Sequence, residues 1–295
     1  MAYFEEIGDA LSLDVLRCYV VAAAVVGALD LLVAQRCKAR WFALHALANA
    51  IIATTSAPGV IASLADPHNS GNGDAYPESS SPFAPASRWP IAFLNVVHLY
   101  HCLFFKLTPS DIFHHGLFVG GVSIPAQLFR WGSMRSFMSF FASGLPGGID
   151  CARPPAQFVR AILRAILRAI LRHRSNAPHI SRRADAMLAL VKQGKVEKMT
   201  QRRVCASLNQ WCRGPGLVIS SFLIYSAVMS GRGTFPAPFG FWTASLMMYN
   251  SLLYTGSSIR AHEKAVTLAI ATGDSAAGGT KTNAYPVSAE KLRTE

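Results

Sequence analysis

Four histidines lie within 18 residues of one another, in a chain that has only nine. His98 and His101 are spaced so that they can share one face of a helix, and His114 and His115 follow closely after Asp111. Imidazole transfers protons near neutral pH and also binds metals, and a neighbouring carboxylate can fix which ring nitrogen carries the proton. We therefore expect any chemistry of this chain to take place around these residues.

Three interpretations of the histidines are open. In the first, one histidine is the general base for acyl transfer onto a lipid nucleophile, and Asp111 orients it. In the second, the histidines bind a metal, but His45 is the only further ligand expected at a comparable depth, so we predict no metal site. In the third, they form structural hydrogen bonds between helices. Ionisable groups at membrane depth rarely face lipid, so all three interpretations place them inside a bundle.

Further polar residues extend the candidate site. Asn95 lies one helical turn before His98, and Asn250 and Tyr254 lie one turn apart in the last apolar segment. The residues that we expect to bind a ligand are Asn95, His98, His101, Asn250 and Tyr254. The residues that we expect at a catalytic centre, if there is one, are Asp111, His114 and His115.

The elements that carry these residues are long, apolar and nearly free of charge. The chain is 51% hydrophobic and 15% charged, whereas soluble domains carry about 25% charged residues. A helix needs about 20 apolar residues to cross a hydrocarbon core of about 30 Å. Candidate spans are residues 13–33, 41–64, 89–107, 112–129, 136–149, 214–230 and 235–256. The sequence thus predicts an all-α, polytopic membrane bundle with about seven spans.

The N-terminus and the positive charges predict an orientation. The acidic N-terminus lacks the basic region of a cleaved signal peptide, so the first span is expected to be an uncleaved anchor. With the N-terminus outside and seven crossings, 23 of the 28 Lys and Arg residues fall on the inner side, as the positive-inside rule requires. The polar connection 65–87 and the tail 271–295 are expected to be unstructured.

Half of the basic residues fall in one segment. Residues 151–213 hold 14 of the 28 Lys and Arg residues, and their net charge of +12 equals that of the whole chain. No aromatic platform or nucleic-acid motif accompanies this charge, so we expect no nucleic-acid partner.

Within this segment the tetrapeptide RAIL occurs three times in succession. On a helix, its arginines advance by about 40° per repeat and form a cationic stripe. Such a helix can lie among lipid headgroups and bind anionic lipid; the alternative is a low-complexity expansion without a function. The residues expected at the membrane surface are Arg160, Arg164, Arg168 and Arg172.

The order of several short motifs resembles the TLC-domain family, which includes the ceramide synthases and the translocating-chain-associated membrane protein. The motifs are HALAN at 45–49, YHCLF at 100–104 and DIFHH at 111–115. The chain is most similar to a little-characterised branch of that family from protists and algae. The resemblance implies a membrane domain at 1–265 that is interrupted by a basic insertion at 151–186.

The resemblance also implies a lipid-related function in the endoplasmic reticulum or another endomembrane. Residues 116–129 contain no acidic residue, unlike the matching helix of the ceramide synthases. We therefore expect first a protein that binds or senses membrane lipids and influences lipid composition. One alternative is a lipid N-acyltransferase that uses acyl-CoA as substrate and needs no other cofactor. Another is an accessory subunit that binds a membrane-protein partner.

Overall fold

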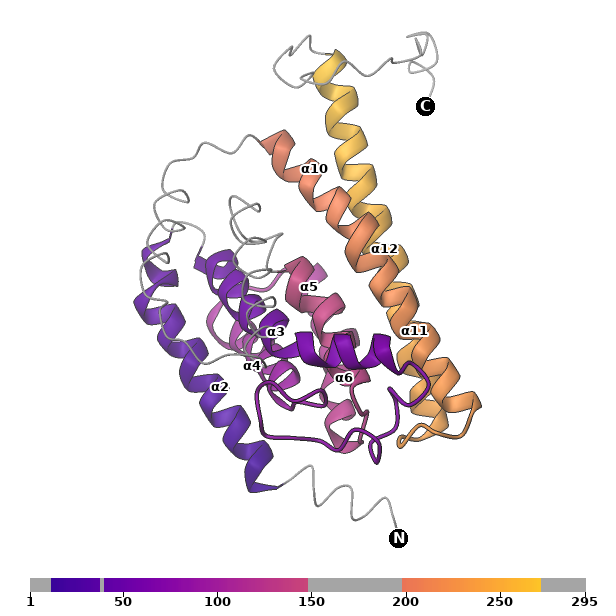
Figure 1. Cartoon of the computed structure of the whole chain (residues 1–295). Coiled ribbons are helices and arrows are strands. Elements are labelled where there is room, and N and C mark those ends of the chain that lie inside the picture. The colour runs from indigo at the N-terminus through magenta and orange to yellow at the C-terminus, as the bar shows by residue number, and fades with distance from the viewer. Residues whose placement is uncertain (1–11, 38–39, 148–197, 272–295) are drawn as a thin grey trace, which may run out of the picture.

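The computed structural model describes residues 12–37, 40–147 and 198–271, which form a bundle of helices (Figure 1). These residues contain no strand, so the predicted all-α class is confirmed for them. The insertion at 151–186, with the four repeat arginines, lies outside the described residues, as does the tail beyond 271.

Three helices of the described part are long and apolar enough to cross a membrane, judged by length and composition. They are Leu13–Arg36, Arg40–Ala65 and Arg202–Met229, and Trp89–Phe104 is apolar but shorter. Three is fewer than the seven spans that the sequence predicts. The other expected spans are helical as well: the helix at 89–104 is apolar but short, and the segments at 112–129 and 136–147 change helix type along their length.

The N-terminal helices are regular. Helix α2, Leu13–Leu32, begins after Ser12, whose hydroxyl accepts a bond from the Val15 amide. A short 3-10 helix η1, Ala34–Arg36, leads towards α3, Arg40–Ala65. Helix α4, Trp89–Phe104, starts with a proline in its first turn, where no helical partner for its nitrogen is lost.

The expected span at 112–129 is broken into three pieces. Helix α5, Pro109–His114, continues as the π-helix η2, His115–Ser123, and then as the 3-10 helix η3, Pro125–Leu128. Ile124 donates to the Val119 carbonyl, the wide spacing of a π-helix. Pro125 follows directly, and because it has no amide hydrogen the chain changes helix type there. Such π segments occur frequently at functional sites.

The later helices show the same irregularity. Helix α6, Met134–Ser139, runs into the π-helix η4, Phe140–Gly144. Helix α10, Lys198–Leu208, is joined through the π-helix η5, Asn209–Arg213, to α11, Gly214–Met229. The last helix, α12, Ala237–Ala271, continues well beyond the span predicted to end at residue 256.

The helices pack in a sequence of neighbours that brings distant parts of the chain together. Helix α2 lies against α4, α3 lies against both α4 and α6, and α6 lies against α11, which pairs with α12. The start of α2 and the connection 66–88 lie at one end of the bundle, and the start of α10 and the end of α12 lie at the other (Figure 1).

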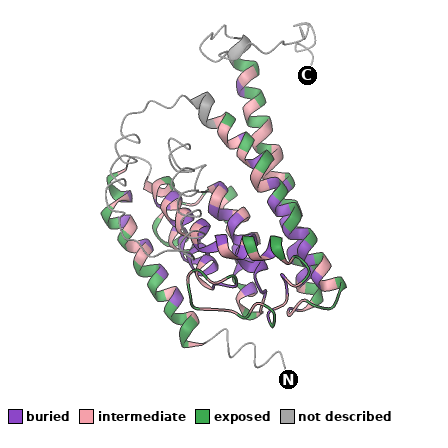
Figure 2. Cartoon of the chain, viewed as in Figure 1, coloured by how far each residue is buried: buried purple, intermediate pink, exposed green. Residues whose placement is uncertain are grey.

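The outer surface of the bundle is largely apolar. Figure 2 shows exposed residues along the outward faces of α2, α11 and α12, and many of them are large hydrophobic side chains. Leu13 is 83% exposed, Leu103 is 76% exposed and Leu252 is 67% exposed. A soluble monomer rarely exposes large apolar patches, so an exterior with this many exposed large hydrophobic side chains is compatible with insertion in a membrane.

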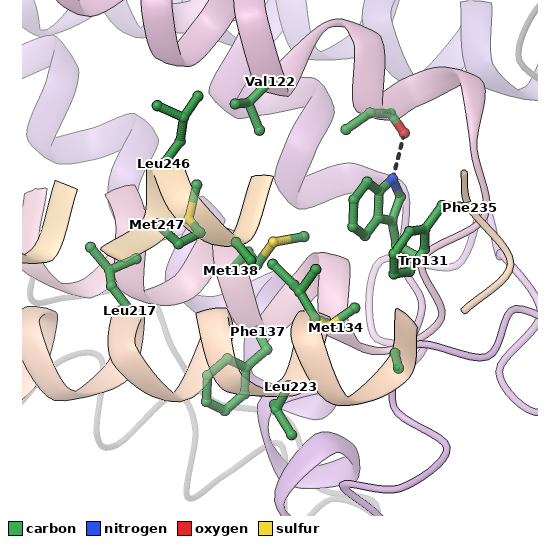
Figure 3. Packing of buried hydrophobic residues seen from close by; sticks show 14 of the residues in the cluster. Val122, Trp131, Met134, Phe137, Met138, Leu217, Leu223, Phe235, Leu246 and Met247 are labelled. Atoms are coloured by element: carbon green, nitrogen blue, oxygen red, sulfur yellow. Dashed lines mark hydrogen bonds between the residues drawn. The ribbon is translucent and has the colours of Figure 1, made fainter. Parts of the chain in front are cut away.

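The interior between α6, α11 and α12 is closely packed (Figure 3). Trp131 is fully buried, stacks on Phe235 with ring centroids 4.0 Å apart, and donates from its indole nitrogen to the Ala126 carbonyl at 2.9 Å. Leu217 and Met247 approach this cluster from α11 and α12. These contacts hold α12 in a fixed position relative to η2 and α6, which matters because α12 carries two of the expected site residues.

The connection 66–88 contains turns but no helix or strand, as the sequence predicts, yet it packs closely on the bundle. Glu78 forms ion pairs with Arg88 and with the buried Arg135 at the start of α6. The Ser70 carbonyl accepts from the Met134 amide at 3.1 Å. The connection therefore covers one end of the bundle, an arrangement that its polar composition did not indicate.

Candidate functional site

A cavity of about 370 Å³ lies inside the bundle, between α3, α4, α5, η2, α6, η4 and α12. This volume is within the range of about 300–1,000 Å³ that small-molecule sites occupy. Five histidines from four separate elements line it, and we call them the histidine cluster: His45, His98, His101, His114 and His115.

The imidazole rings of the histidine cluster form a connected set. The centroid of the His98 ring lies 5.8 Å from that of His45, 5.6 Å from that of His114 and 5.3 Å from that of His115. The rings of His101 and His115 are 5.1 Å apart. The structure therefore brings together the four histidines singled out in the sequence and adds His45 of α3.

His98 occupies the centre of the cluster and has a defined tautomer. Its Nδ1 lies 2.7 Å from the Leu94 carbonyl oxygen, one helical turn earlier in α4. A carbonyl oxygen can only accept, so Nδ1 must carry the proton and donate it. The second nitrogen, Nε2, is then left with a free lone pair on a residue that lines the cavity. His98 can accordingly accept a proton or a hydrogen bond from a bound molecule.

His114 is connected to α12. Its Nδ1 lies 2.8 Å from the hydroxyl oxygen of Tyr254, so a residue expected to bind a ligand contacts the histidine cluster directly. The guanidinium of Arg213 lies 4.4 Å above the Tyr254 ring and donates to the Ala142 carbonyl at 2.8 Å. The cation and the phenol ring thus fix the position of the hydroxyl group beside His114.

His101 lies flat against Trp41 of α3. The two ring centroids are 3.7 Å apart and the rings are inclined by only 10°. His101 is 4% exposed, and its Nδ1 has no hydrogen-bond partner in the described part of the chain. Its neighbour His115 differs, because the His115 Nδ1 lies 3.3 Å from the Cys102 thiol on the exposed side of α4.

Asp111 lines the cavity but has a local structural role. Its carboxylate accepts from the amide and the hydroxyl of Thr108, at 2.8 Å and 2.7 Å, and so completes a capping box at the start of α5. No hydrogen bond joins Asp111 to a histidine among the described residues. The orienting partners that the structure provides are Leu94 for His98 and Tyr254 for His114.

The two predicted asparagines have different environments. Asn95 is fully buried, donates to the Tyr19 hydroxyl at 2.7 Å and accepts from Ser123, so it joins α2, α4 and η2 without lining the cavity. Asn250 does line the cavity, is 2% exposed, and its Oδ1 has no hydrogen-bond partner in the structure described.

Among the cavity residues that were not predicted as site residues, Arg213 and Trp41 stand out because they contact predicted site residues, and Arg135 because it is a buried charge. In the sequence Arg135 and Arg213 lie at the borders of the spans predicted at 136–149 and 214–230, but both line the cavity. Trp41 was taken only as the first residue of a span. The four-residue spacing of Trp41 and His45 puts both on one helix face, and this was the available signal for α3. Arg135 could not be anticipated, because its partner Glu78 comes from an irregular connection.

The described residues contain no group of three or more His, Cys, Asp or Glu side chains arranged to hold a metal ion. The arrangement can nevertheless accept a proton at His98 Nε2 and exchange hydrogen bonds at His101, Asn250 and Tyr254. Much of the remaining wall is apolar and includes Ile91, Leu94, Phe118, Val119, Val122, Met138 and Met247, while Ser110, Ser123, Ser139 and Ser143 add hydroxyl groups. The cavity therefore suits a molecule with one polar and one apolar part.

A scan against protein-family models and searches of curated proteins and of solved structures gave no match to this chain.

Proposed function

We propose that this chain is a multi-pass membrane protein whose central cavity binds a lipid, and that it senses or adjusts membrane lipid composition through that cavity. The observation that carries the proposal is the histidine cluster: five imidazoles from α3, α4, α5 and η2 surround one cavity with largely apolar walls. Such a combination fits an amphiphile, with its polar head at the imidazoles and its chain against the apolar wall.

We propose seven crossings, which include the three helices of sufficient length. Helix α4, the α5–η2 segment, the α6–η4 segment and α12 supply the others. Their breaks and polar residues are tolerated at membrane depth because non-helical or polar groups there lie inside protein or line a cavity.

We also propose membership of the TLC-domain family and residence in an endomembrane such as the endoplasmic reticulum. In support, residues from the three motifs that carry the resemblance lie around the same cavity: His45, His101 and the pair His114–His115. Motifs that are separated in sequence and meet in space are what a shared functional site requires.

The proposal is tested by native mass spectrometry of the protein released from lipid nanodiscs. The wild type should retain a bound lipid. An Ala142→Phe variant should lose it, because a phenyl ring at this lining position occupies part of a cavity of about 370 Å³. The matched control is Ala24→Phe on an exposed position of α2, which should retain the lipid. Equal retention by both variants would contradict lipid binding in the cavity.

Acyl transfer is a second candidate, and the geometry of His98 favours it. In that reaction a lipid amine or hydroxyl attacks the thioester carbonyl of acyl-CoA, His98 Nε2 accepts its proton, and coenzyme A leaves as the thiol. The hydrogen bonds of His98 and Asp111 predict different effects of their substitution on acyl transfer. His98→Gln should reduce acyl transfer by at least about 100-fold, whereas Asp111→Asn should have little effect, because Asp111 is bonded to Thr108 and not to a histidine. A large loss of acyl transfer in Asp111→Asn together with little loss in His98→Gln would exclude His98 as the base.

A further inference from the structure

Some buried side chains of the cavity have polar atoms without a partner, and two of them belong to predicted site residues. Asn250 is 2% exposed and His101 is 4% exposed, and neither Asn250 Oδ1 nor His101 Nδ1 has a hydrogen-bond partner in the described residues. Both residues line the cavity. Buried polar atoms are almost always paired, and an unpaired one is costly. These two atoms therefore indicate where a ligand supplies hydrogen bonds.

The charged groups of the cavity are already engaged. Arg135 forms an ion pair with Glu78 and donates to the Phe129 carbonyl. Arg213 donates to the Ala142 carbonyl and lies over the Tyr254 ring. Asp111 accepts two bonds from Thr108. A charged head group would have to displace these partners, so we expect it to gain no advantage over an uncharged one.

The unpaired atoms also specify the kind of hydrogen bond. The amide oxygen Oδ1 of Asn250 can only accept, so its partner must be a donor. A neutral imidazole such as His101 has one donor and one acceptor nitrogen, so a group that both donates and accepts can serve it. The Arg135 Nε, also unpaired, is a donor that an oxygen of the ligand can satisfy. A hydroxyl both donates and accepts, so it can meet any of these requirements, whereas an ether or ester oxygen only accepts.

We propose that the cavity selects an uncharged lipid whose head group carries a free hydroxyl, which donates to Asn250 and completes the hydrogen bonding of His101. This inference rests on the lipid binding proposed above and specifies its ligand class. Asn250 is suited to this role because Met247 and Tyr254, one turn to either side of it, line the same cavity. The face of α12 that carries Asn250 is thus fixed by contacts in the core and at His114.

The test uses the wild-type protein in phosphatidylcholine nanodiscs and three ligands with the same chain: oleyl alcohol, oleyl methyl ether and oleyl phosphate. Binding is measured with radiolabelled ligand, and partition into empty nanodiscs is subtracted. The alcohol should bind about 10- to 100-fold more tightly than the ether, because only the alcohol donates. The phosphate should bind no better than the ether.

A variant then locates the hydrogen bond. Asn250→Leu keeps the approximate volume and removes the acceptor, so it should abolish the preference for the alcohol over the ether. Its control, Tyr249→Phe, removes a hydroxyl from the neighbouring position on the exposed side of α12 and should keep the preference. The comparison of ligands on the wild type does not depend on the folding of either variant.

The possible failures are distinguishable. Equal binding of alcohol and ether to the wild type, or preference for the phosphate, would overturn the hydroxyl inference and leave the lipid-binding proposal standing. A preference that survives in Asn250→Leu would overturn the assignment to Asn250. Absence of saturable binding for all three ligands would overturn the inference together with the proposal on which it rests.

Discussion

Two polar regions of the bundle lie close in sequence but differ in how their hydrogen bonds are completed. The first, which we call the Asp30 site, joins α2, α3 and α4: Asp30 is fully buried, binds Arg40 through both carboxylate oxygens and accepts from the Tyr100 hydroxyl at 2.9 Å. The second is the histidine cluster, where His101 and Asn250 keep unpaired atoms beside a cavity.

The difference shows that polar residues in apolar helices have two roles here, one structural and one open to a ligand. The Asp30 site is closed, since each carboxylate oxygen is paired within the protein, and its effect is to fix three helices relative to one another. The histidine cluster is open, and its unpaired atoms become satisfied only when something enters. Tyr100 and His101 are adjacent in the sequence, yet they belong to different regions because they point to different faces of α4.

The comparison predicts first that the Asp30 site is essential for stability. Asp30→Ala leaves Arg40 and Tyr100 without their acceptor, and should lower the free energy of unfolding by about 3 kcal/mol, at the low end for a buried pair because Arg40 is partly exposed. Unfolding in mixed detergent micelles measures this. Asp14→Ala, on an exposed position of the same helix, is the control and should change stability by less than about 0.5 kcal/mol.

Disturbing the close contact between α3 and α6 should have the next largest effect on the free energy of unfolding. A methyl group at Gly59 of α3 would overlap both Ser136 of α6 and the Pro85 carbonyl. Gly59→Ala should therefore lower the free energy of unfolding by about 2 kcal/mol, although alanine is the better helix former. Gly27→Ala in α2, where an added methyl meets no atom within 4 Å, should be neutral or slightly stabilising. A stable Gly59→Ala protein would show that α3 and α6 are further apart.

The histidine cluster should behave in the opposite way to the Asp30 site. His101→Phe keeps an aromatic ring against Trp41 and removes both ring nitrogens, so stability should change by less than about 1 kcal/mol. Retention of lipid in native mass spectrometry should nevertheless fall by at least about 10-fold. A strongly destabilised variant would mean that the cluster holds the bundle together, as the Asp30 site does.

The RAIL repeat lies outside the described residues. We expect it to bind membranes through its charge alone. A peptide of residues 157–174 should bind liposomes only when they contain anionic lipid, and the binding should weaken as salt increases. Cosedimentation over a range of salt concentrations measures this. A peptide with glutamine in place of Arg160, Arg164, Arg168 and Arg172 is the control. Equal binding to neutral liposomes would contradict a headgroup contact.

The sequence predicted the helical class because long apolar runs without charge have few other solutions in a membrane. It did not predict the breaks at 115–123, 140–144 and 209–213, because a π-helix has the same hydrophobic pattern as an α-helix and depends on tertiary contacts. It also overestimated the regularity of the span at 112–129, where the residues before Pro125 adopt a wider helical spacing.

For the site, the sequence predicted which residues are neighbours on one helix, but it did not predict which residues of different helices are in contact. The pairs His98–His101 and His114–His115 could be grouped because neighbours on one helix stay together. Asp111 was assigned to a histidine because it is close in sequence, but its position at the third residue of α5 favours a cap over a cross-helix bond. Arg135 and Glu78 could not be paired, since 57 residues and an irregular connection separate them.

The most direct test of the account is to ask which ends of the bundle lie on which side of a membrane. Asp74→Thr creates a glycosylation site at Asn72 in the connection 66–88, and Tyr285→Thr creates one at Asn283 in the tail. When each is synthesised with microsomes, seven crossings predict that only the Asp74→Thr protein is glycosylated. A signal peptide fused to the tail that carries Tyr285→Thr shows that this site can be modified. Glycosylation of both proteins, or of the Tyr285→Thr protein alone, would contradict the proposed membrane arrangement.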